Sequence, residues 1–128
     1  MNGTDFLIDT NILIYIIQGR IRISDFAHIR SNLYISSVTC METLGYSFGD
    51  ESEEKAVTAF CKTFERIFLS EEIEEQAIII RKRHKIKMPD AIIAATATIH
   101  DITLVTCNNS DYKNISGLKL FTPAVNSI

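Results

Sequence analysis

Short apolar segments alternate with helical patterns along the whole chain, and this alternation leaves few possible folds. The strand candidates are apolar on both faces, as buried parallel strands are: Phe6–Ile8, Leu33–Ile35, Ile67–Leu69, Leu104–Val105 and, more weakly, Leu118–Leu120. Helical patterns stand between them, at Ile12–Ile17, Ile23–Ile29, Thr39–Phe48, Glu53–Glu65, Glu72–Lys85 and Pro89–His100. The alternation predicts βαβ units, and hence an α/β fold in which helices cover both faces of a central parallel sheet of four to five short strands.

Length and composition fit a single domain spanning residues 1–128, with a hydrophobic content of 46%. No apolar run approaches the roughly 18 residues of a transmembrane helix. The opening MNGTDFLID has no basic stretch of the kind that begins a secretory signal, so we expect a cytoplasmic protein. Cys40, Cys61 and Cys107 show no metal-binding spacing, which predicts reduced, buried thiols rather than a zinc site or disulfides.

Four acids lie where an apolar strand is expected to end and a helix to begin. They are Asp9 in FLIDTNILIY, Glu42 in ISSVTCMETLGY, Asp90 in KMPDAIIAATA and Asp111 in LVTCNNSDY. The carboxyl ends of parallel strands share one edge of a sheet, and ligands bind in the crevice there. Clustered carboxylates repel one another unless a hard divalent cation binds them. The pattern therefore indicates a metal-dependent enzyme that cleaves phosphodiesters.

Each acid also has a purely structural interpretation. Asp9 suits a helix cap, and Thr39 with Glu42 matches the S/T-x-x-E capping box. Asp90 follows Pro89 in the first turn of a helix, where the helix dipole favours a negative charge. Asn108 and Asp111 have a box-like spacing within a turn. Considered singly, Glu42 and Asp111 favour the structural interpretation, and Asp9 and Asp90 fit either one.

The set of four acids favours a functional site, because Ser, Thr or Asn would cap a helix equally well. Neutral groups that could orient the carboxylates, bound waters or a substrate accompany them: Thr10, Asn11, Ser36, Thr39, Thr106 and Asn108. Two further acids are too distant to join the cluster. Asp5 lies about 13 Å from Asp9 along a strand, and Asp101 lies about 16 Å from Asp90 along a helix.

The net charge of −3 argues against a general polyanion-binding surface. The cations are nevertheless unevenly placed, with a run at Arg81, Lys82, Arg83, Lys85 and Lys87. If the protein binds nucleic acid, we expect this run to contact the phosphates. A solvated helix end, whose cations suit the helix dipole, explains the run equally well.

The ordered motifs resemble those of the PIN domain family, and in particular VapC-type toxins. DTN after the first strand, SSVTCME, PDAIIAATA and the T-x-N-x-x-D/E-F/Y segment LVTCNNSDY follow in the family's order, and the resemblance extends to the final SGLKLF. Cys107 stands where many relatives carry Arg or another polar residue, and Asn108 where some carry a further acid.

The resemblance implies a Mg²⁺- or Mn²⁺-dependent endoribonuclease with a PIN-like three-layer α/β/α fold. It places catalytic and metal-binding roles on Asp9, Glu42, Asp90 and Asp111, and it makes Thr10, Asn11, Thr39, Thr106 and Asn108 candidates for positioning the substrate or supporting the acids. It also implies a cognate antitoxin, an RNA substrate and a homodimer.

Two alternatives from other classes remain at this point. A catalytically silent module could keep the fold in order to bind a partner. A receiver-like phosphoacceptor domain also has an acidic pocket, but it needs adjacent early acids and a late lysine, and the first strand here supplies only Asp9. Nucleotide binding is disfavoured, because the chain has neither a GxxxxGK[ST] loop nor a GxGxxG motif.

Overall fold

A computed structural model describes residues 5–127 of the chain. Its five parallel strands are β1 (Asp5–Ile8), β2 (Asn32–Ser36), β3 (Glu65–Ile67), β4 (Thr103–Val105) and β5 (Leu120–Phe121), arranged in the order β3-β2-β1-β4-β5. The helices are α1 (Thr10–Ile17), α2 (Ser37–Leu44), α3 (Glu51–Cys61), α4 (Glu71–Arg83), α5 (Met88–His100) and the short α6 (Asn109–Tyr112). The predicted parallel sheet with intervening helices is confirmed.

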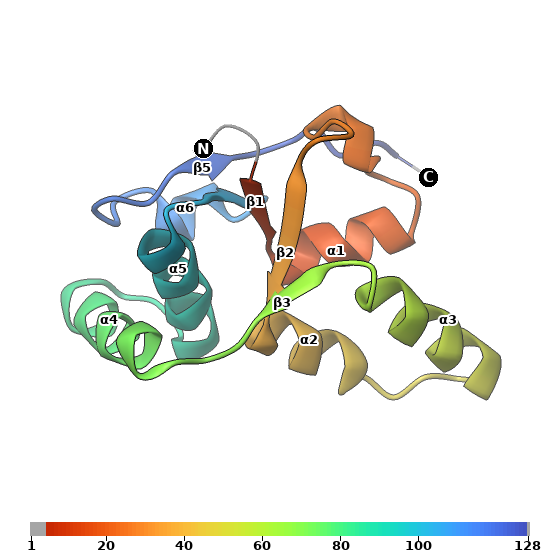
Figure 1. The fold of residues 1–128 in the computed structure, drawn as a ribbon, viewed down its shortest axis with the longest axis horizontal. Coiled ribbons are helices and arrows are strands. Elements are labelled where there is room, and N and C mark those ends of the chain that lie inside the picture. The colour runs from red at the N-terminus through yellow and green to blue at the C-terminus, as the bar shows by residue number, and fades with distance from the viewer. Residues whose placement is uncertain (1–4, 128) are drawn as a thin grey trace.

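The alternation of side chains along β1 creates the two cores of the molecule. Leu7 faces α4 and α5, and it packs there with Leu104 and Ile73. Phe6 and Ile8 face the other way and pack with side chains of α1, α2 and α3. Figure 1 shows these helix groups on opposite sides of the sheet. Because strands expose successive side chains on opposite faces, an apolar run in β1 requires helices on both sides, which is the predicted three-layer arrangement.

The strand order excludes the receiver-like alternative. Receiver-like domains of the flavodoxin type have the order 2-1-3-4-5, whereas here β2 lies between β1 and β3. Cys40 and Cys61 are buried free thiols as predicted, and Cys107 is half-buried. Within residues 5–127, no helix is both long and apolar enough to cross a bilayer.

Several predicted boundaries are wrong. The helix expected at Ile23–Ile29 is only a 3-10 turn, Ile23–Asp25, because Ile29 is fully exposed and gives a helix nothing to bury. The strand expected at Ile67–Leu69 is β3, two residues earlier, and Phe68 and Leu69 lie exposed beyond it. At the edge of a sheet, charged residues such as Glu65 and Arg66 are well tolerated, so an apolar pattern is a poor guide there.

The remaining differences concern where elements begin and end. β5 starts two residues later than the predicted Leu118–Leu120. The helix predicted at Thr39–Phe48 is α2, which begins at Ser37 and ends before Gly45. The helices predicted at Glu53–Glu65 and Glu72–Lys85 are α3 and α4, and both end earlier than expected.

Candidate active site

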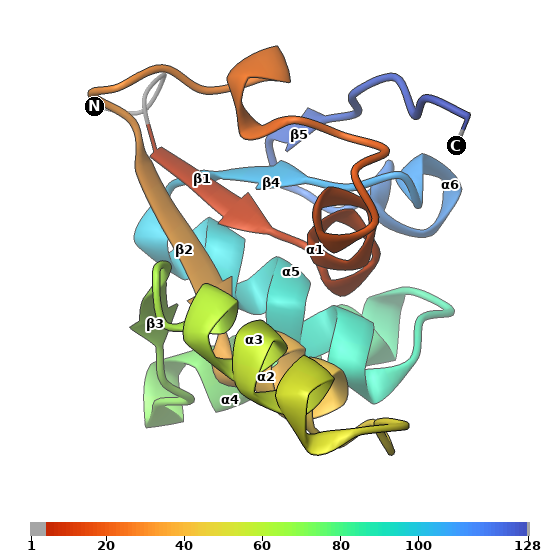
Figure 2. The ribbon, with the colours of Figure 1, turned by 90° about the vertical axis from the view of Figure 1, so that its right-hand side faces the viewer.

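Asp9 and Thr106 meet where the direction in which strands are added to the sheet reverses. The chain passes from β1 to β2 and β3 on one side, then crosses to β4 on the other side of β1. Such a switch point opens a crevice at the carboxyl ends of the two strands. Asp9 directly follows β1 and Thr106 directly follows β4, and Figure 2 shows both strands pointing toward the side where α1 and α6 begin.

Asp9 is buried, with only 3% of its surface exposed. It caps α1: its Oδ1 accepts from the Thr10 N–H at 2.9 Å, and its Oδ2 accepts from the Thr106 hydroxyl at 2.6 Å. Burial raises the pKa of Asp9, and the negative charges of Asp90 and Glu42 raise it further, although the two hydrogen bonds act to lower it. The capping interpretation of Asp9 is therefore correct, but the residue also shares the electrostatic field of two other acids.

Glu42 lies in the last turn of α2, and its carboxylate contacts α1. The Thr10 hydroxyl donates to Glu42 Oε1 at 2.7 Å, and Thr10 Oγ lies 3.0 Å from Thr39 Oγ. The capping box predicted for Thr39 and Glu42 is wrong, because the N-cap of α2 is Ser36, whose Oγ accepts from the Thr39 N–H at 3.1 Å. Glu42 has no capping role, so the structural explanation for its position is lost.

Asp90 lies in the first turn of α5, as predicted, and is half-buried. The hydroxyl of Tyr112 donates to Asp90 Oδ1 at 3.3 Å. Burial raises the pKa of Asp90; the Tyr112 hydrogen bond lowers it, the charges of Glu42 and Asp111 raise it, and Lys87 lowers it. Asp9, Glu42 and Asp90 thus form one interacting acidic group, with Asp111 acting on Asp90.

Asp111 is exposed on α6, at the rim of this group. The box-like arrangement expected for Asn108 and Asp111 is not formed through side chains, since Asn108 makes no side-chain cap and instead accepts the Asp111 N–H at its carbonyl, at 3.0 Å. The Asn108 N–H donates to Thr106 Oγ at 2.9 Å, which fixes the hydroxyl that donates to Asp9.

Tyr112 was not predicted as a site residue, although it is fully buried beneath the acids. Burial, together with the charges of Asp9 and Asp90 and the hydrogen bond to Asp90, raises the pKa of Tyr112 far above its ordinary value, so the phenol stays a proton donor. The only sequence signal was its place at the aromatic end of the LVTCNNSDY motif.

Hydroxyl groups from other elements hold three of the acids in place. Thr106 serves Asp9, Thr10 serves Glu42, and Tyr112 serves Asp90. Among residues 5–127, no group of three or more His, Cys, Asp or Glu side chains is arranged so that it could hold a metal ion. The buried Oδ1 of Asn11 has no hydrogen-bond partner in the described part of the chain.

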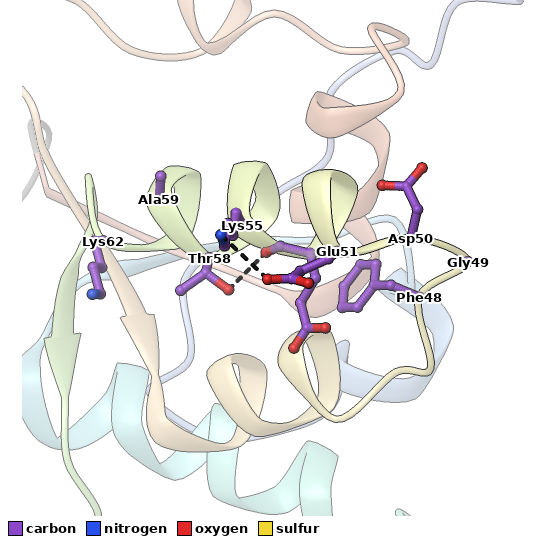
Figure 3. Close-up of a pocket in the computed structure, with 9 residues that line it drawn as sticks. Phe48, Gly49, Asp50, Glu51, Lys55, Thr58, Ala59 and Lys62 are labelled. Atoms are coloured by element: carbon purple, nitrogen blue, oxygen red, sulfur yellow. Dashed lines mark hydrogen bonds and ion pairs between the residues drawn. The ribbon is translucent and has the colours of Figure 1, made fainter.

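Two surface hollows lie near α3 and differ in character. A groove of about 530 Å³ between α1, α2 and α3 is lined mainly by apolar side chains, including Ile14, Ile17 and Tyr46, and Glu42 lies on its wall. A second hollow, of about 830 Å³, covers the outer face of α3 and is lined by polar residues such as Glu51 and Lys55 (Figure 3). This second hollow includes none of the four acids, so we do not associate it with the site.

The sequence profile of the PIN domain family matches residues 6–118. The chain belongs to the PIN domain family. Ribonuclease VapC1 of Rickettsia felis is 31% identical over 127 residues, which cover 91% of this PIN domain and 94% of that protein. The resemblance seen in the ordered motifs is confirmed.

Solved structures support the same assignment. A toxin–antitoxin complex from Klebsiella pneumoniae contains a chain that is 34% identical, with a TM-score of 0.76 over 92% of this PIN domain and 97% of that chain. A chain of the VapBC2 crystal structure from Rickettsia felis, bound to a DNA fragment from its promoter, is 22% identical and has a TM-score of 0.81 over 94% of this chain and 99% of that one. At that identity the second likeness shows the fold alone.

Proposed function

We propose that this PIN domain, over residues 1–128, is an endoribonuclease that hydrolyses RNA phosphodiester bonds and acts as the toxin of a toxin–antitoxin pair. The observation that carries the proposal is the joint placement of Asp9, Glu42 and Asp90 at the switch point of the sheet. The relatives named as a ribonuclease and as part of a toxin–antitoxin complex support the choice of substrate and role.

We propose Mg²⁺ or Mn²⁺ as the cofactor, held by Asp9, Glu42 and Asp90 with Asp111 completing the site. The donors are chemically suitable, because hard divalent cations prefer carboxylate oxygens, and Mg²⁺ binds through few carboxylates while it keeps several waters. Binding would have to draw the carboxylates together, since residues 5–127 contain no group of three acids already arranged to hold a metal ion. When bound, such an ion lowers the pKa of an attacking water and stabilises charge on the phosphoryl oxygens. Burial raises the pKa of Asp9 and of Asp90, and repulsion from the neighbouring acids raises both further; a bound cation would remove that repulsion.

The remaining residues of the site orient these acids. Thr106 fixes one oxygen of Asp9 and Thr10 fixes one oxygen of Glu42, each through a short hydrogen bond. Tyr112 holds one oxygen of Asp90 and cannot compete as an anion, because its pKa is raised. Thr39 supports Thr10 from α2, and Asn108 supports Thr106. Asn11 offers a buried oxygen without a protein partner, which suits a role in holding water or substrate.

An antitoxin would bind in the apolar groove between α1, α2 and α3. Large apolar side chains that line it, such as Ile17 and Tyr46, remain 41% and 71% exposed. Apolar surface gathered into one groove suits a partner helix or segment, and Glu42 on the wall lets that partner cover the acids as well. We also propose that the protein works as a homodimer, as the family resemblance implies, and that it acts in the cytoplasm.

The proposal is tested with purified protein, single-stranded RNA and either Mg²⁺ or Mn²⁺. Cleavage that EDTA stops and that Asp9→Asn abolishes supports the nuclease. A protein that binds the metal by calorimetry yet leaves a panel of RNAs intact would instead be the catalytically silent binding module. Glu53→Gln, which changes another glutamate of the same groove, is the matched control and should cleave normally.

A further inference from the structure

A run of exposed cations joins α4 to α5, and the hydrolysis proposed above does not use it. Arg81, Lys82 and Arg83 form the last turn of α4, and Lys85 and Lys87 follow in the connection. We call residues 81–87 the basic segment. Every one of these cations is exposed, and none belongs to an ion pair found within residues 5–127.

The helix dipole explains only part of the basic segment. Cations in the last turn of α4 face the negative end of the dipole, as Arg81, Lys82 and Arg83 do. Lys85 and Lys87 lie beyond that end, because the backbone is already extended at His84, with φ −134° and ψ 151°. These two lysines need another explanation.

The backbone holds both lysines toward solvent. Ile86, between them, is buried in the core formed with Ile80 and Ala91, and its N–H donates to the His84 carbonyl at 3.1 Å. Lys87 is also extended, with φ −73° and ψ 152°. Lys85 and Lys87 are both exposed while Ile86 between them is buried, so the two lysines point to solvent on either side of an anchored residue.

The basic segment ends at the acidic group. Lys87 is the N-cap residue of α5, and its carbonyl accepts the Ala91 N–H at 2.9 Å. Asp90 lies within this first turn of the helix. Lys87 lies close enough to Asp90 for its charge to act on that carboxylate. Figure 2 places the connection from α4 to α5 on the same side of the molecule as the start of α1 and α6.

A polyanion needs such cations to approach this site. The chain carries a net charge of −3, and the acids at the switch point repel phosphates. A row of cations that leads to the acids lowers this barrier locally. We propose that the basic segment, and Lys85 and Lys87 in particular, binds the phosphate backbone of single-stranded RNA and leads it to the acidic group. This inference rests on the proposed function.

The test measures RNA binding separately from cleavage. Fluorescence anisotropy of a labelled single-stranded RNA is followed in Mg²⁺ with Asp9→Asn protein as the parent, so that the probe stays intact. Lys85→Gln/Lys87→Gln should bind on the order of tenfold more weakly at about 50 mM salt, and the slope of log affinity against log salt should flatten by about 1.4, or about 0.7 for each lost contact. Lys85→Arg/Lys87→Arg should bind as the parent does.

Lys55→Gln/Lys62→Gln is the matched control, since it removes the same charge from α3, where Figure 3 shows both side chains. It should leave affinity within about twofold and the slope unchanged. Equal losses in the two Gln pairs would mean that only the overall charge matters, and would overturn the inference. The inference is also overturned if Lys85→Gln/Lys87→Gln binds RNA as the parent does. This includes the case in which that variant loses binding only to polyglutamate, which is used as a probe for an acidic protein partner.

Failure of the proposed function gives a different result. Wild-type protein that cleaves no RNA contradicts the nuclease, whereas the binding comparison still decides whether the basic segment is an RNA surface. A parent that binds no RNA at all overturns the inference even if cleavage of other RNAs is observed.

Discussion

Thr106 and Asp9 are 97 residues apart in the chain, yet the Thr106 hydroxyl donates to Asp9 Oδ2 at 2.6 Å. Both groups are buried, and the same hydroxyl oxygen accepts the N–H of Asn108. This contact joins β1 to β4 at the point where the acids gather, and it fixes the orientation of the most buried carboxylate among them.

Thr106→Val should destabilise the metal-free protein by about 1–3 kcal/mol, because it leaves a buried carboxylate oxygen without its donor. Thr106→Ser keeps the hydroxyl and should cost about 1 kcal/mol or less, mainly through the lost methyl group. Urea unfolding in EDTA measures both values. Equal losses for Val and Ser would show that packing, rather than the hydrogen bond to Asp9, is what Thr106 contributes.

Glu42→Gln should cut RNA cleavage by on the order of 100-fold or more while changing the metal-free stability by about 0.5 kcal/mol at most. The Gln carbonyl can still accept the Thr10 hydroxyl, and the loss of charge relieves repulsion from Asp9 and Asp90. Cleavage rates in Mg²⁺ are compared with melting temperatures in EDTA. A fully active Glu42→Gln protein would remove Glu42 from the site.

Tyr112→Phe should lower metal affinity or cleavage by on the order of 10–100-fold, as loss of a group that supports a metal ligand commonly does. The ring stays in place, so stability should fall by no more than about 1.5 kcal/mol, the value of one hydrogen bond. Tyr112→Ala removes the buried ring as well and should cost about 3–5 kcal/mol. Mn²⁺ binding by calorimetry, beside urea unfolding, separates the two effects; unchanged binding by the Phe variant would assign Tyr112 to packing alone.

The raised pKa of Asp9 sets the sign of a pH effect on the metal-free protein. A carboxyl with a higher pKa in the folded state binds more protons there than when unfolded, so folding is favoured at low pH. Stability should therefore fall as the pH rises through and above the ordinary value of 3.8, and stay lower above the folded-state pKa. Asp9→Asn should lose this dependence, and its gain in stability over wild type should be larger at neutral pH than near pH 4. Melts in EDTA across this range measure the difference, and a gain that shrinks toward neutral pH would contradict the argument.

The central strands and the four acids could be predicted because their signals are local. β1 and β4 are apolar on both faces, Asp9 directly follows β1, and Asp90 lies in the first turn of α5. Glu42 departs from this rule, because it lies in the last turn of α2, and it was recognised through the SSVTCME motif. The start of α2 could not be settled in this way, because Ser36 and Thr39 are both good caps and only the fold selects Ser36. The hydroxyl partners of the acids were even harder to predict from the sequence. Tyr112 contacts Asp90 only once α6 and α5 are packed together, and the spacing of the two residues in the sequence does not predict this contact.

The edge strands also lay beyond the sequence pattern. β3 carries Glu65 and Arg66 and pairs with one neighbour only, so its position follows from its pairing with β2 rather than from its own hydrophobicity. An amphipathic segment is likewise not sufficient for a helix, as the single turn at Ile23–Asp25 shows.

The insertion of β4 between β1 and β5 has a consequence for synthesis of the protein. A growing chain that has reached residue 100 already carries Asp9, Glu42 and Asp90, but it lacks the strand that brings Thr106 to Asp9 and the helix that brings Tyr112 to Asp90. The donors that hold Asp9 and Asp90 are therefore in place only once residues 106 and 112 have been made and folded against the rest of the chain. We expect a chain that stops before residue 106 to present Asp9 and Asp90 without these hydroxyl donors, so the acidic group gains its final geometry only late in folding.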